Sequence, residues 1–424
     1  MAITDAMRNG AAAVRLRTRT LLVGVARWAV VPLALTCATA LVLLERVLGL
    51  RRRRARPRLV WGPTPIISLM YWSAAMRGRG YESFTCVTGL YPMHAGDEFD
   101  HLRADFLGPG WLAELVRDYV VFAWTLRRGD VFLRFFDGGY LRDTPLSRLE
   151  LPLLRLAGKK VVVSPFGGDI AVVGHLGELE GPLLSDYPHI GEQSDRTERQ
   201  VRHTLRWADV VIMNWQFGFL PSFDVRWPTM IAIDTDRWRP PETHSDGDGR
   251  SAEVTVFHAP NHRAIKGTEH LERAVSELQG EGFRVRLKIL EGRPYEEIQA
   301  AMRACDIAAD QFLAGYAMFA VEGMASGKPV LSNLSSMPAP VRSTESLREI
   351  PIVDTDPQRL TDDLRRLVEQ PAERHRLGRA GREFVERHHS YESVADGWEA
   401  VLSFAWQGTP LPADMAPAGP PESG

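Results

Sequence analysis

Short apolar runs alternate with stretches of helical periodicity from residue 58 onward. Runs rich in β-branched or aromatic residues at 130–136, 160–163 and 208–213 predict buried strands. Strands of this kind, separated by helical patterns, are typical of parallel sheets with crossover helices. The pattern therefore predicts a doubly wound, Rossmann-like lobe over residues 58–239.

A second series of strand and helix signals follows a polar linker. Residues 240–252 are rich in Pro, Gly, Ser and Asp, a composition typical of a linker. Strand-like runs at 254–258 and 285–290 then flank a helical pattern at 267–278, which predicts a second Rossmann-like lobe over residues 253–388. Two such lobes leave a cleft, and ligands of these folds bind beyond the carboxyl ends of the strands.

The C-terminal end carries weaker signals. Residues 389–406 predict one further helix. Residues 407–424 are rich in Pro, Gly and Ala, which predicts a disordered tail.

An uncharged stretch covers residues 28–44, and arginines fill positions 51–54. The stretch is at the lower length limit for a membrane span. Arginines also precede it, so a helix lying in the interface fits almost as well, and a leader helix packed on the protein is the alternative. We expect residues 1–57 to form a membrane-associated helix with a basic collar, peripheral or single-pass, on the cytoplasmic side of the membrane.

Composition narrows the function classes. The chain has 424 residues, more than one hydrophobic core usually serves, and this agrees with two domains. Its net charge of −2 gives no electrostatic case for a nucleic acid partner. The three cysteines are widely spaced, which argues against a disulfide framework or a zinc site.

The first candidate chemistry follows the first strand of the second lobe. Arg263 and Lys266 place a guanidinium and an ammonium near a predicted helix start, directly before Gly267. Two cations beside free backbone N–H groups attract a diphosphate. A solvated basic loop would show the same short motif.

The second candidate block lies around a predicted helix near residue 316. Gly315 stands at a junction of loop and helix, where a backbone can approach a phosphate closely. Glu322 is the single carboxylate of a helix of small and apolar residues, and such an acid is costly without partners. A ribose diol would supply two donors. A Glu that faces solvent, or one paired with an arginine of the lobe, is the alternative.

The two blocks resemble the C-terminal half of the family 4 glycosyltransferases, which share the GT-B fold. Residues 322–330, Glu-Gly-Met-Ala-Ser-Gly-Lys-Pro-Val, match the family's closing motif. Residues 233–240 resemble its interdomain segment, and residues 377–386 resemble its closing helix. The resemblance covers about residues 205–405, and it extends more loosely back to residue 59.

The resemblance implies that the second lobe binds a nucleoside diphosphate sugar and the first lobe binds the acceptor. Lys266, helped by Arg263, would hold the diphosphate, and Glu322 would hold the ribose hydroxyls. The Gly315 end of the helix would face the phosphates and the sugar. Family members generally retain the anomeric configuration, and neither a metal nor another cofactor is expected.

The second lobe departs from the family pattern at two positions. The first Glu of the Glu-x7-Glu motif would fall at Ala314, so a sugar-contacting carboxylate is missing there. Asp310 and Gln311, just before it, are the candidate substitutes. The family's arginine would fall at Asn261, which makes the role of Arg263 less direct than that of Lys266.

The first lobe departs too. Many members carry a His after the strand before the active site, and residues 163–169 contain none. Asp169, in a Gly-rich loop at the carboxyl end of a strand, either positions the sugar or the acceptor hydroxyl or caps a helix. Gly62 follows the first strand and is a candidate backbone contact for the diphosphate.

Together these observations predict a GT-B glycosyltransferase that transfers a sugar to a hydroxyl of a glycan or lipid-linked acceptor. A catalytically silent GT-B scaffold, suggested by Ala314, and a sugar-nucleotide epimerase are the alternatives. The predicted catalytic residues are Asp169, Lys266 and Arg263. The predicted donor-binding residues are Gly62, Asn261, Arg263, Lys266, Gly267, Asp310, Gln311, Gly315, Tyr316 and Glu322.

Overall fold

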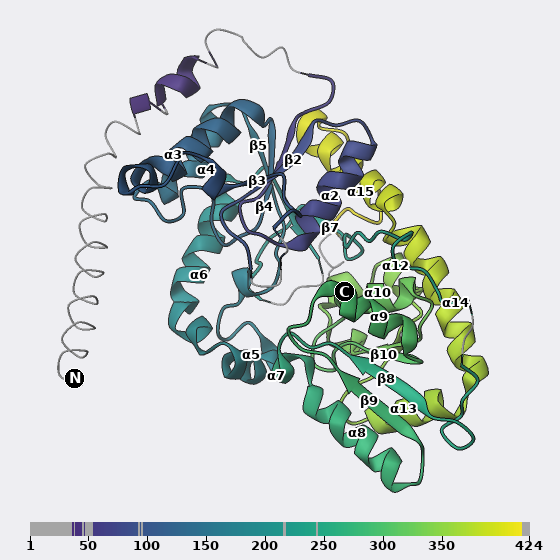
Figure 1. Cartoon of the computed structure of the whole chain (residues 1–424). Helices are drawn as coiled ribbons and strands as arrows, with labels where there is room; N and C mark the ends of the chain where they lie inside the picture. The colour runs from purple at the N-terminus through teal and green to yellow at the C-terminus, as the bar shows by residue number, and fades with distance from the viewer. Residues whose placement is uncertain are drawn as a thin grey trace, which may run out of the picture.

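The computed structural model folds the chain into two α/β lobes with long helices around them (Figure 1). It describes residues 36–37, 39–44, 46, 54–91, 94, 96–214, 218–242 and 245–417. Each lobe is built on a parallel sheet, so the predicted pair of Rossmann-like lobes is confirmed.

The first lobe contains a seven-stranded sheet in the order β3-β2-β1-β4-β5-β6-β7. The order reverses at β1, because the chain steps outward from β1 to β3 and then crosses back to pair β4 with β1. The loops after β1 and β4 are therefore neighbours at the carboxyl edge, where ligands of such sheets bind. The strands are β1 (Leu59–Trp61), β2 (Ser83–Val87), β3 (His101–Leu102), β4 (Val131–Arg134), β5 (Lys160–Val163), β6 (Val210–Met213) and β7 (Val225–Arg226).

Crossover helices cover both faces of this sheet, which explains why the central strands are apolar along their whole length. All residues of β1 and β4 are buried. The helices are α2 (Ile67–Gly78), α3 (Trp111–Arg128), α4 (Glu150–Leu156), α5 (Glu180–Asp186) and α6 (Pro188–Trp207).

The second lobe contains a five-stranded sheet in the order β12-β11-β10-β8-β9. Its order reverses at β8, which pairs with β9 on one side and with β10 on the other. The loops after β8 and β10 therefore meet at the carboxyl edge. The strands are β8 (Val254–His258), β9 (Val285–Ile289), β10 (Ile307–Ala309), β11 (Val330–Ser332) and β12 (Val353–Asp354).

Small residues let one helix of this lobe lie close to the sheet. A Cβ on Gly323 of α10 would stand 3.0 Å from Ala308 Cβ and 3.0 Å from Val330 Cγ2. The helices of this lobe are α7 (Arg263–Lys266), α8 (Thr268–Gly280), α9 (Tyr295–Ala304), α10 (Met318–Ala325), α11 (Ala339–Arg342), α12 (Glu345–Arg348), α13 (Leu360–Glu369) and α14 (Pro371–His388). The chain then continues into α15 (Tyr391–Gln407).

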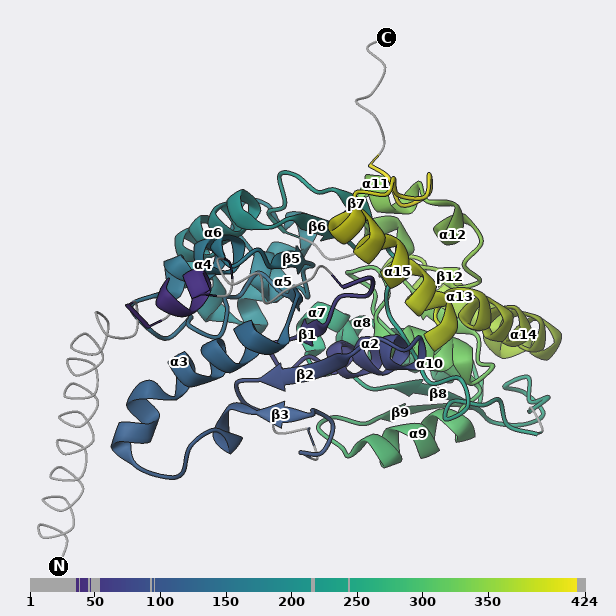
Figure 2. The same cartoon turned by 90° about the horizontal axis from the view of Figure 1, so that it is seen from above.

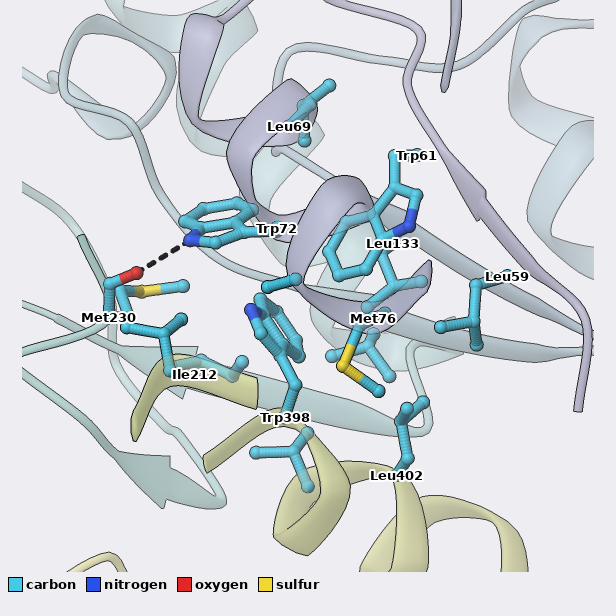
Figure 3. Packing of buried hydrophobic residues seen from close by; sticks show 14 of the residues in the cluster. Leu59, Trp61, Leu69, Trp72, Met76, Leu133, Ile212, Met230, Trp398 and Leu402 are labelled. Carbon is cyan, nitrogen blue, oxygen red and sulfur yellow. Dashed lines mark hydrogen bonds between the residues drawn. The ribbon is translucent and has the colours of Figure 1, made fainter. Parts of the chain in front are cut away.

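The last two helices connect the lobes. α14 packs on the second lobe beside α10, and α15 returns to the first lobe beside α2 (Figures 1 and 2). Trp398 of α15 lies beside the rings of Trp61 and Trp72, with centroid distances of 4.9 and 5.2 Å (Figure 3). The ring of Trp227 lies 5.3 Å from that of Trp398. Trp72 also donates from Nε1 to Met230 O at 2.6 Å. The C-terminal helix is thus part of the first lobe's core.

The prediction of a disordered tail over residues 407–424 is wrong for residues 407–417, which the structure describes. Met415 is buried in the first lobe's core, and its carbonyl accepts from Arg226 N at 2.8 Å. Leu411 packs against the same core. Two apolar side chains therefore fix a segment whose overall composition suggested disorder. Residues 418–424 lie outside the described part of the chain.

Most of the predicted membrane segment also lies outside the described residues. Residues 36–37, 39–44 and 46 are helical, and Val42 is buried against the core of the first lobe. Arg46 Nη1 donates to Leu156 O at 3.1 Å. No helix within the described ranges combines the length and the apolar character that crossing a membrane requires.

Candidate functional site

The two lobes touch through segments that follow strands in both sheets. Ile265 N, in α7, donates to Asp186 Oδ2, at the end of α5, at 3.1 Å. The next first-lobe residue, Tyr187, bonds through its hydroxyl to the ring of His262. Figure 1 shows α5 and α7 side by side at this junction. The carboxyl edges of the two sheets therefore meet around the loop that carries Lys266.

A buried ion pair occupies the place where the sequence predicted the donor phosphates. Lys266 Nζ lies 2.8 Å from Oδ1 of Asp310, the residue directly after β10. Asp310 Oδ2 accepts from the backbone N–H of Ala317, just before α10, at 2.7 Å. Both charged side chains are buried. The structure thus brings together two of the predicted donor residues and bonds them to each other.

Gly267 provides the turn that directs Lys266 inward. Its φ is +71°, in the left-handed region that favours glycine. A Cβ there would approach Phe312 Cβ to 3.3 Å. The carbonyl of Lys266 accepts from Phe312 N at 3.1 Å, which ties the loop after β8 to the loop after β10.

His258, at the end of β8, is a structural residue behind this pair. Its Nδ1 lies 2.8 Å from Ala309 O, and its Nε2 lies 2.9 Å from Thr268 Oγ1. Burial lowers the pKa of His258 to about 4, so the ring is neutral at physiological pH. It links β8, β10 and α8 without a charge.

Glu322 lies inside α10 and has a tyrosine as its partner. Tyr295 OH donates to Glu322 Oε1 at 2.9 Å, and the same hydroxyl accepts from Trp238 Nε1 at 3.0 Å. Burial raises the pKa of Glu322 to about 8, against the opposing effect of the Tyr295 hydrogen bond. Glu322 is buried and its partner is a tyrosine, so the predicted alternatives of a solvent-facing Glu and of an arginine pair are both wrong.

A tyrosine of the first lobe extends this network. Tyr71 OH lies 3.3 Å from Tyr295 OH, and the two residues come from α2 and α9. Because Tyr295 gives its single proton to Glu322, Tyr71 must donate to Tyr295. The carboxylate predicted to hold ribose is therefore one hydrogen bond away from a contact between the lobes.

The loop before α10 is bonded internally. Gly315 N donates to Ser336 Oγ at 2.8 Å, and a Cβ on Gly315 would stand 2.8 Å from Met337 Cγ. The Tyr316 side chain is fully buried and donates to Pro228 O, in the segment after β7, at 3.2 Å. Gln311 is also buried, beside the Asp310 pair in sequence.

Arg263 and Asn261 lie on the outside of the same loop. The Arg263 guanidinium, 41% exposed, pairs with Glu272 at 2.6 Å and with Glu291 at 2.5 Å. Asn261 is exposed. The guanidinium is thus bonded to surface carboxylates, whereas the ammonium of Lys266 is buried with Asp310.

Asp169 is held by backbone N–H groups at the carboxyl ends of β4 and β5. Its Oδ2 accepts from Phe136 N at 2.9 Å, and its Oδ1 accepts from Phe166 N and Gly167 N at 3.0 Å each. Burial raises the pKa of Asp169 to about 7, and the charge of Asp137 adds to the rise. These contacts are those of a side chain that fixes two loops of the site.

Gly62 is required by a close approach of the backbone. A Cβ there would stand 2.0 Å from Cys86 O, and the Gly62 N–H already donates to Leu133 O at 3.1 Å. The N–H of Gly62 is therefore already used in the sheet of the first lobe.

Sequence reasoning did not single out Asp137, which lies in the loop after β4. Its Oδ2 accepts from Thr64 Oγ1 at 2.6 Å and from Arg142 Nη1 at 3.0 Å. Its Oδ1 is buried and has no hydrogen-bond partner among the described residues. Burial raises the pKa of Asp137. The available signal was an acid followed by two glycines after a strand at the switch point of the sheet.

A cavity of about 830 Å³ lies on the first lobe, and one of its lining residues, Arg142, donates to Asp137 Oδ2. Its wall mixes charged, hydroxyl-bearing and apolar groups from the loops after β1, β2 and β4 and from α3 and α6. The lining residues are Pro65, Thr88, Gly89, Leu90, Tyr91, Arg103, Glu114, Asp118, Tyr140, Arg142, Asp143 and Arg196.

The second lobe matches a known protein family. Residues 258–384, which include the Lys266–Asp310 pair and Glu322, match the family model described as glycosyl transferases group 1. Among curated proteins, the chain is 26% identical over 250 residues to the MMP alpha-(1->4)-mannosyltransferase of Mycolicibacterium hassiacum. That match covers 53% of this chain and 59% of the relative, so the chain spans little more than half of the relative's length.

Solved structures show the same fold in proteins of distant sequence. Sucrose-phosphate synthase from Thermosynechococcus elongatus has a TM-score of 0.53 at 14% identity, with 84% of this chain and 100% of that chain covered. A glycosyltransferase from Rickettsia africae has a TM-score of 0.53 at 9% identity, with the same coverage. Anabaena HepE in complex with UDP-glucose has a TM-score of 0.50 at 14% identity, with 82% and 100% covered. The two lobes thus form a GT-B-like fold, and the match of the second lobe supports a glycosyltransferase.

Proposed function

We propose that this protein transfers a sugar from a nucleoside diphosphate sugar to a hydroxyl of a glycan or lipid-linked acceptor, with retention of configuration, as a family 4-like enzyme. The observation that carries the proposal is the position of Lys266 and Glu322. Both are buried within the matched segment, at the edge of the second sheet that faces the first lobe. An ammonium for the phosphates and a carboxyl group for the ribose are the groups that such a donor requires.

The donor side supplies stabilisation of the leaving group. As the bond between the sugar and the diphosphate breaks, negative charge grows on the diphosphate, and Lys266 provides a fixed positive charge in a site shielded from water. Glu322 accepts from ribose hydroxyls, and Tyr295 holds the carboxyl group in place. The sugar gains positive character, and the acceptor oxygen attacks it.

The acceptor side is the cavity of the first lobe. Its mixed lining offers hydrogen-bond donors and acceptors in numbers that suit a polyhydroxylated acceptor. Asp137, which is bonded to the lining residue Arg142, has one buried oxygen, Oδ1, without a partner among the described residues, and we assign this oxygen to a hydroxyl of the acceptor. Asp169 supports this edge through its three backbone hydrogen bonds.

A catalytically silent scaffold is the second candidate function. It is favoured by Ala314, which stands where family members carry the sugar-contacting carboxylate. A silent protein would bind the donor without transferring or hydrolysing it, and this separates the two candidates by experiment.

We also propose that residues 1–57 attach the protein to the cytoplasmic face of a membrane. The uncharged stretch at 28–44 and the arginines at 51–54 support this. The test is co-sedimentation of the full chain with vesicles that contain anionic lipid. Binding should weaken when residues 51–54 are replaced by Ser, and unchanged binding would contradict a role for the arginines.

Thermal unfolding with nucleotides tests the donor site directly. UDP, GDP and ADP, and their sugars, are added to the wild type, to Lys266→Ala and to a control, Lys160→Ala, which removes a partly exposed lysine paired with Asp209. A ligand at 100 times its dissociation constant adds about 2.7 kcal/mol to the free energy of unfolding, or a few degrees in melting temperature. We expect a shift with one base, kept in Lys160→Ala and lost in Lys266→Ala. No shift with any nucleotide in folded wild type would reject the donor site.

A further inference from the structure

Each group predicted to hold the donor's phosphates already has a bonded partner within the chain. Lys266 Nζ and Ala317 N both bond to the Asp310 carboxylate, at 2.8 and 2.7 Å. Gly315 N bonds to Ser336 Oγ at 2.8 Å. Two of these groups, Lys266 Nζ and Ala317 N, therefore bond to an anion that the protein itself supplies.

Asp310 is placed in the manner of a bound phosphate. One of its oxygens faces an ammonium, and the other faces the backbone N–H just before an eight-residue helix, α10. The carboxylate is 1% exposed and comes from the strand that neighbours β8 in the sheet. Two different donors thus converge on one acid, which fills the position where the loops after β8 and β10 meet.

A phosphate and this carboxylate cannot share Lys266 at hydrogen-bond distance without strong repulsion between like charges. We propose that Asp310 is an internal counter-ion of the donor site, and that a nucleoside diphosphate binds by displacing it from Lys266 and Ala317. This inference rests on the proposed function.

Displacement also places an acid beside the sugar. Ala314 leaves the position of the family's sugar-contacting carboxylate without an acid, and Asp310 belongs to the same loop. Once displaced by the phosphates, the Asp310 carboxylate accepts from a sugar hydroxyl. The acid therefore has Lys266 as its partner before the donor binds and the sugar as its partner afterwards.

The substitution Asp310→Asn separates this role from a structural one. Asn keeps the shape and leaves an amide oxygen for Lys266, but it removes the competing charge. Calorimetric titration with UDP, GDP and ADP, each without a sugar, should show roughly tenfold tighter binding of the preferred nucleotide. Transfer from the nucleotide sugar at saturating donor should fall, because the sugar loses its acid. The matched control is Asp362→Asn, which removes an exposed acid paired with Arg365 and should change neither quantity.

The outcomes keep the inference apart from the proposed function. Nucleotide binding by the wild type that weakens in Asp310→Asn would overturn the inference alone, since Asp310 would then support Lys266 rather than compete with its ligand. Tighter binding by Asp310→Asn than by the wild type would support it. No binding by either protein would reject the donor site and the inference with it.

If Asp310→Asn does not fold, the wild type provides the second measurement. Carbodiimide labelling of carboxyl groups, read by mass spectrometry, should leave Asp310 unmodified in the free protein, where it is 1% exposed. Adding the preferred nucleoside diphosphate should increase its labelling severalfold if the acid is displaced. Labelling that stays unchanged at saturating nucleotide would overturn the inference.

Discussion

The facing edges of the two lobes differ in whether all of their polar groups have bonded partners. In the second lobe, Lys266 Nζ and Ala317 N are bonded to Asp310, and Gly315 N is bonded to Ser336 Oγ. In the first lobe, Asp137 Oδ2 accepts from Arg142, but Asp137 Oδ1 is buried without a partner among the described residues. The exposed Arg196, which lines a cavity of about 830 Å³, also has no bonded partner among them.

The difference separates two ways of preparing a site for a ligand. Buried polar groups that are bonded to each other are stable without a ligand, and a ligand must exchange one partner for another. Groups without partners gain their bonds when the ligand arrives. We call the carboxyl edge of the second sheet the donor edge and that of the first sheet the acceptor edge. We expect substitutions on the donor edge to change how easily a ligand replaces an internal partner. We expect substitutions on the acceptor edge to change direct contacts with the ligand.

The largest expected effect tests whether the acceptor edge is rigid. Buried Glu150 accepts from Arg134 Nη1 at 2.9 Å and from the N–H groups of Tyr140 and Leu141 at 3.1 and 2.7 Å. Glu150→Ala leaves the buried guanidinium uncompensated, so the free energy of unfolding should fall by about 3–5 kcal/mol in urea titration.

Glu82→Ala is the control for this prediction. It breaks an exposed pair with Arg54, and it should cost less than about 1 kcal/mol. A loss of similar size in both variants would show that the acceptor edge is not held by the Glu150 network.

The second largest expected effect is a change in the free energy of unfolding with pH. The folded pKa of Asp169 is about 7, above its ordinary value of 3.8, so the folded state binds the proton more tightly than the unfolded state. The contribution to stability is complete below the unfolded pKa and is lost as the pH rises through the folded pKa. The free energy of unfolding should therefore fall across this window by up to about 1.4 kcal/mol per pH unit for this group.

Asp169→Asn isolates that contribution. Glu322, whose folded pKa is about 8 against an ordinary 4.5, changes the slope with the same sign, so Glu322→Gln is measured in parallel. Urea unfolding at several pH values should show a shallower fall for each variant than for the wild type. Identical slopes for Asp169→Asn and the wild type would mean that the carboxyl group is ionised throughout the window.

The fold could be predicted from the sequence because strands and helices are indicated by patterns of neighbouring residues. Apolar runs such as those of β4 and β5 are buried on both faces, and helical periodicity separates them, so their order along the chain predicts two parallel sheets. The tail was mispredicted for a related reason. Its composition is that of a disordered segment, but the burial of Met415 depends on the surface of the first lobe, which composition does not describe.

The candidate site was predictable in its residue types and not in its bonds. Lys266, Asp310 and Glu322 stood out by charge and by position after strands or within an apolar helix. Their partners are 44 residues apart in one case and 27 in the other, so no local pattern joins Lys266 to Asp310 or Tyr295 to Glu322. Asp137 was missed because the buried, unpartnered oxygen is a property of the folded edge alone.

A moderate effect is expected from the ribose acid of the donor edge. Glu322→Gln keeps a hydrogen-bond acceptor for Tyr295 OH but removes the charge that ribose hydroxyls would meet above the folded pKa of about 8, so the titration is made above that pH. A hydrogen bond to a charged group contributes about 1.5–3 kcal/mol, so nucleoside diphosphate affinity should fall by roughly one to two orders of magnitude in calorimetric titration. Tyr295→Phe, which removes only the positioning hydroxyl, should cause a smaller loss. An equal or larger loss in Tyr295→Phe would show that the network acts through lobe contact with Tyr71 rather than through Glu322.

The smallest effect concerns the exposed cation of the acceptor edge. Arg196 lines the cavity without a bonded partner among the described residues, so Arg196→Ala should leave the melting temperature unchanged. A single exposed side chain that contacts a ligand contributes on the order of 1 kcal/mol, so KM for the acceptor should rise a fewfold while KM for the donor stays constant. Arg202→Ala removes another exposed arginine of α6, one that pairs with Glu198 and lies outside the cavity lining, and it should change neither constant. If Arg196→Ala raised KM for the donor instead, the cavity would bind the nucleotide sugar. The proposed difference between the donor edge and the acceptor edge would then be wrong.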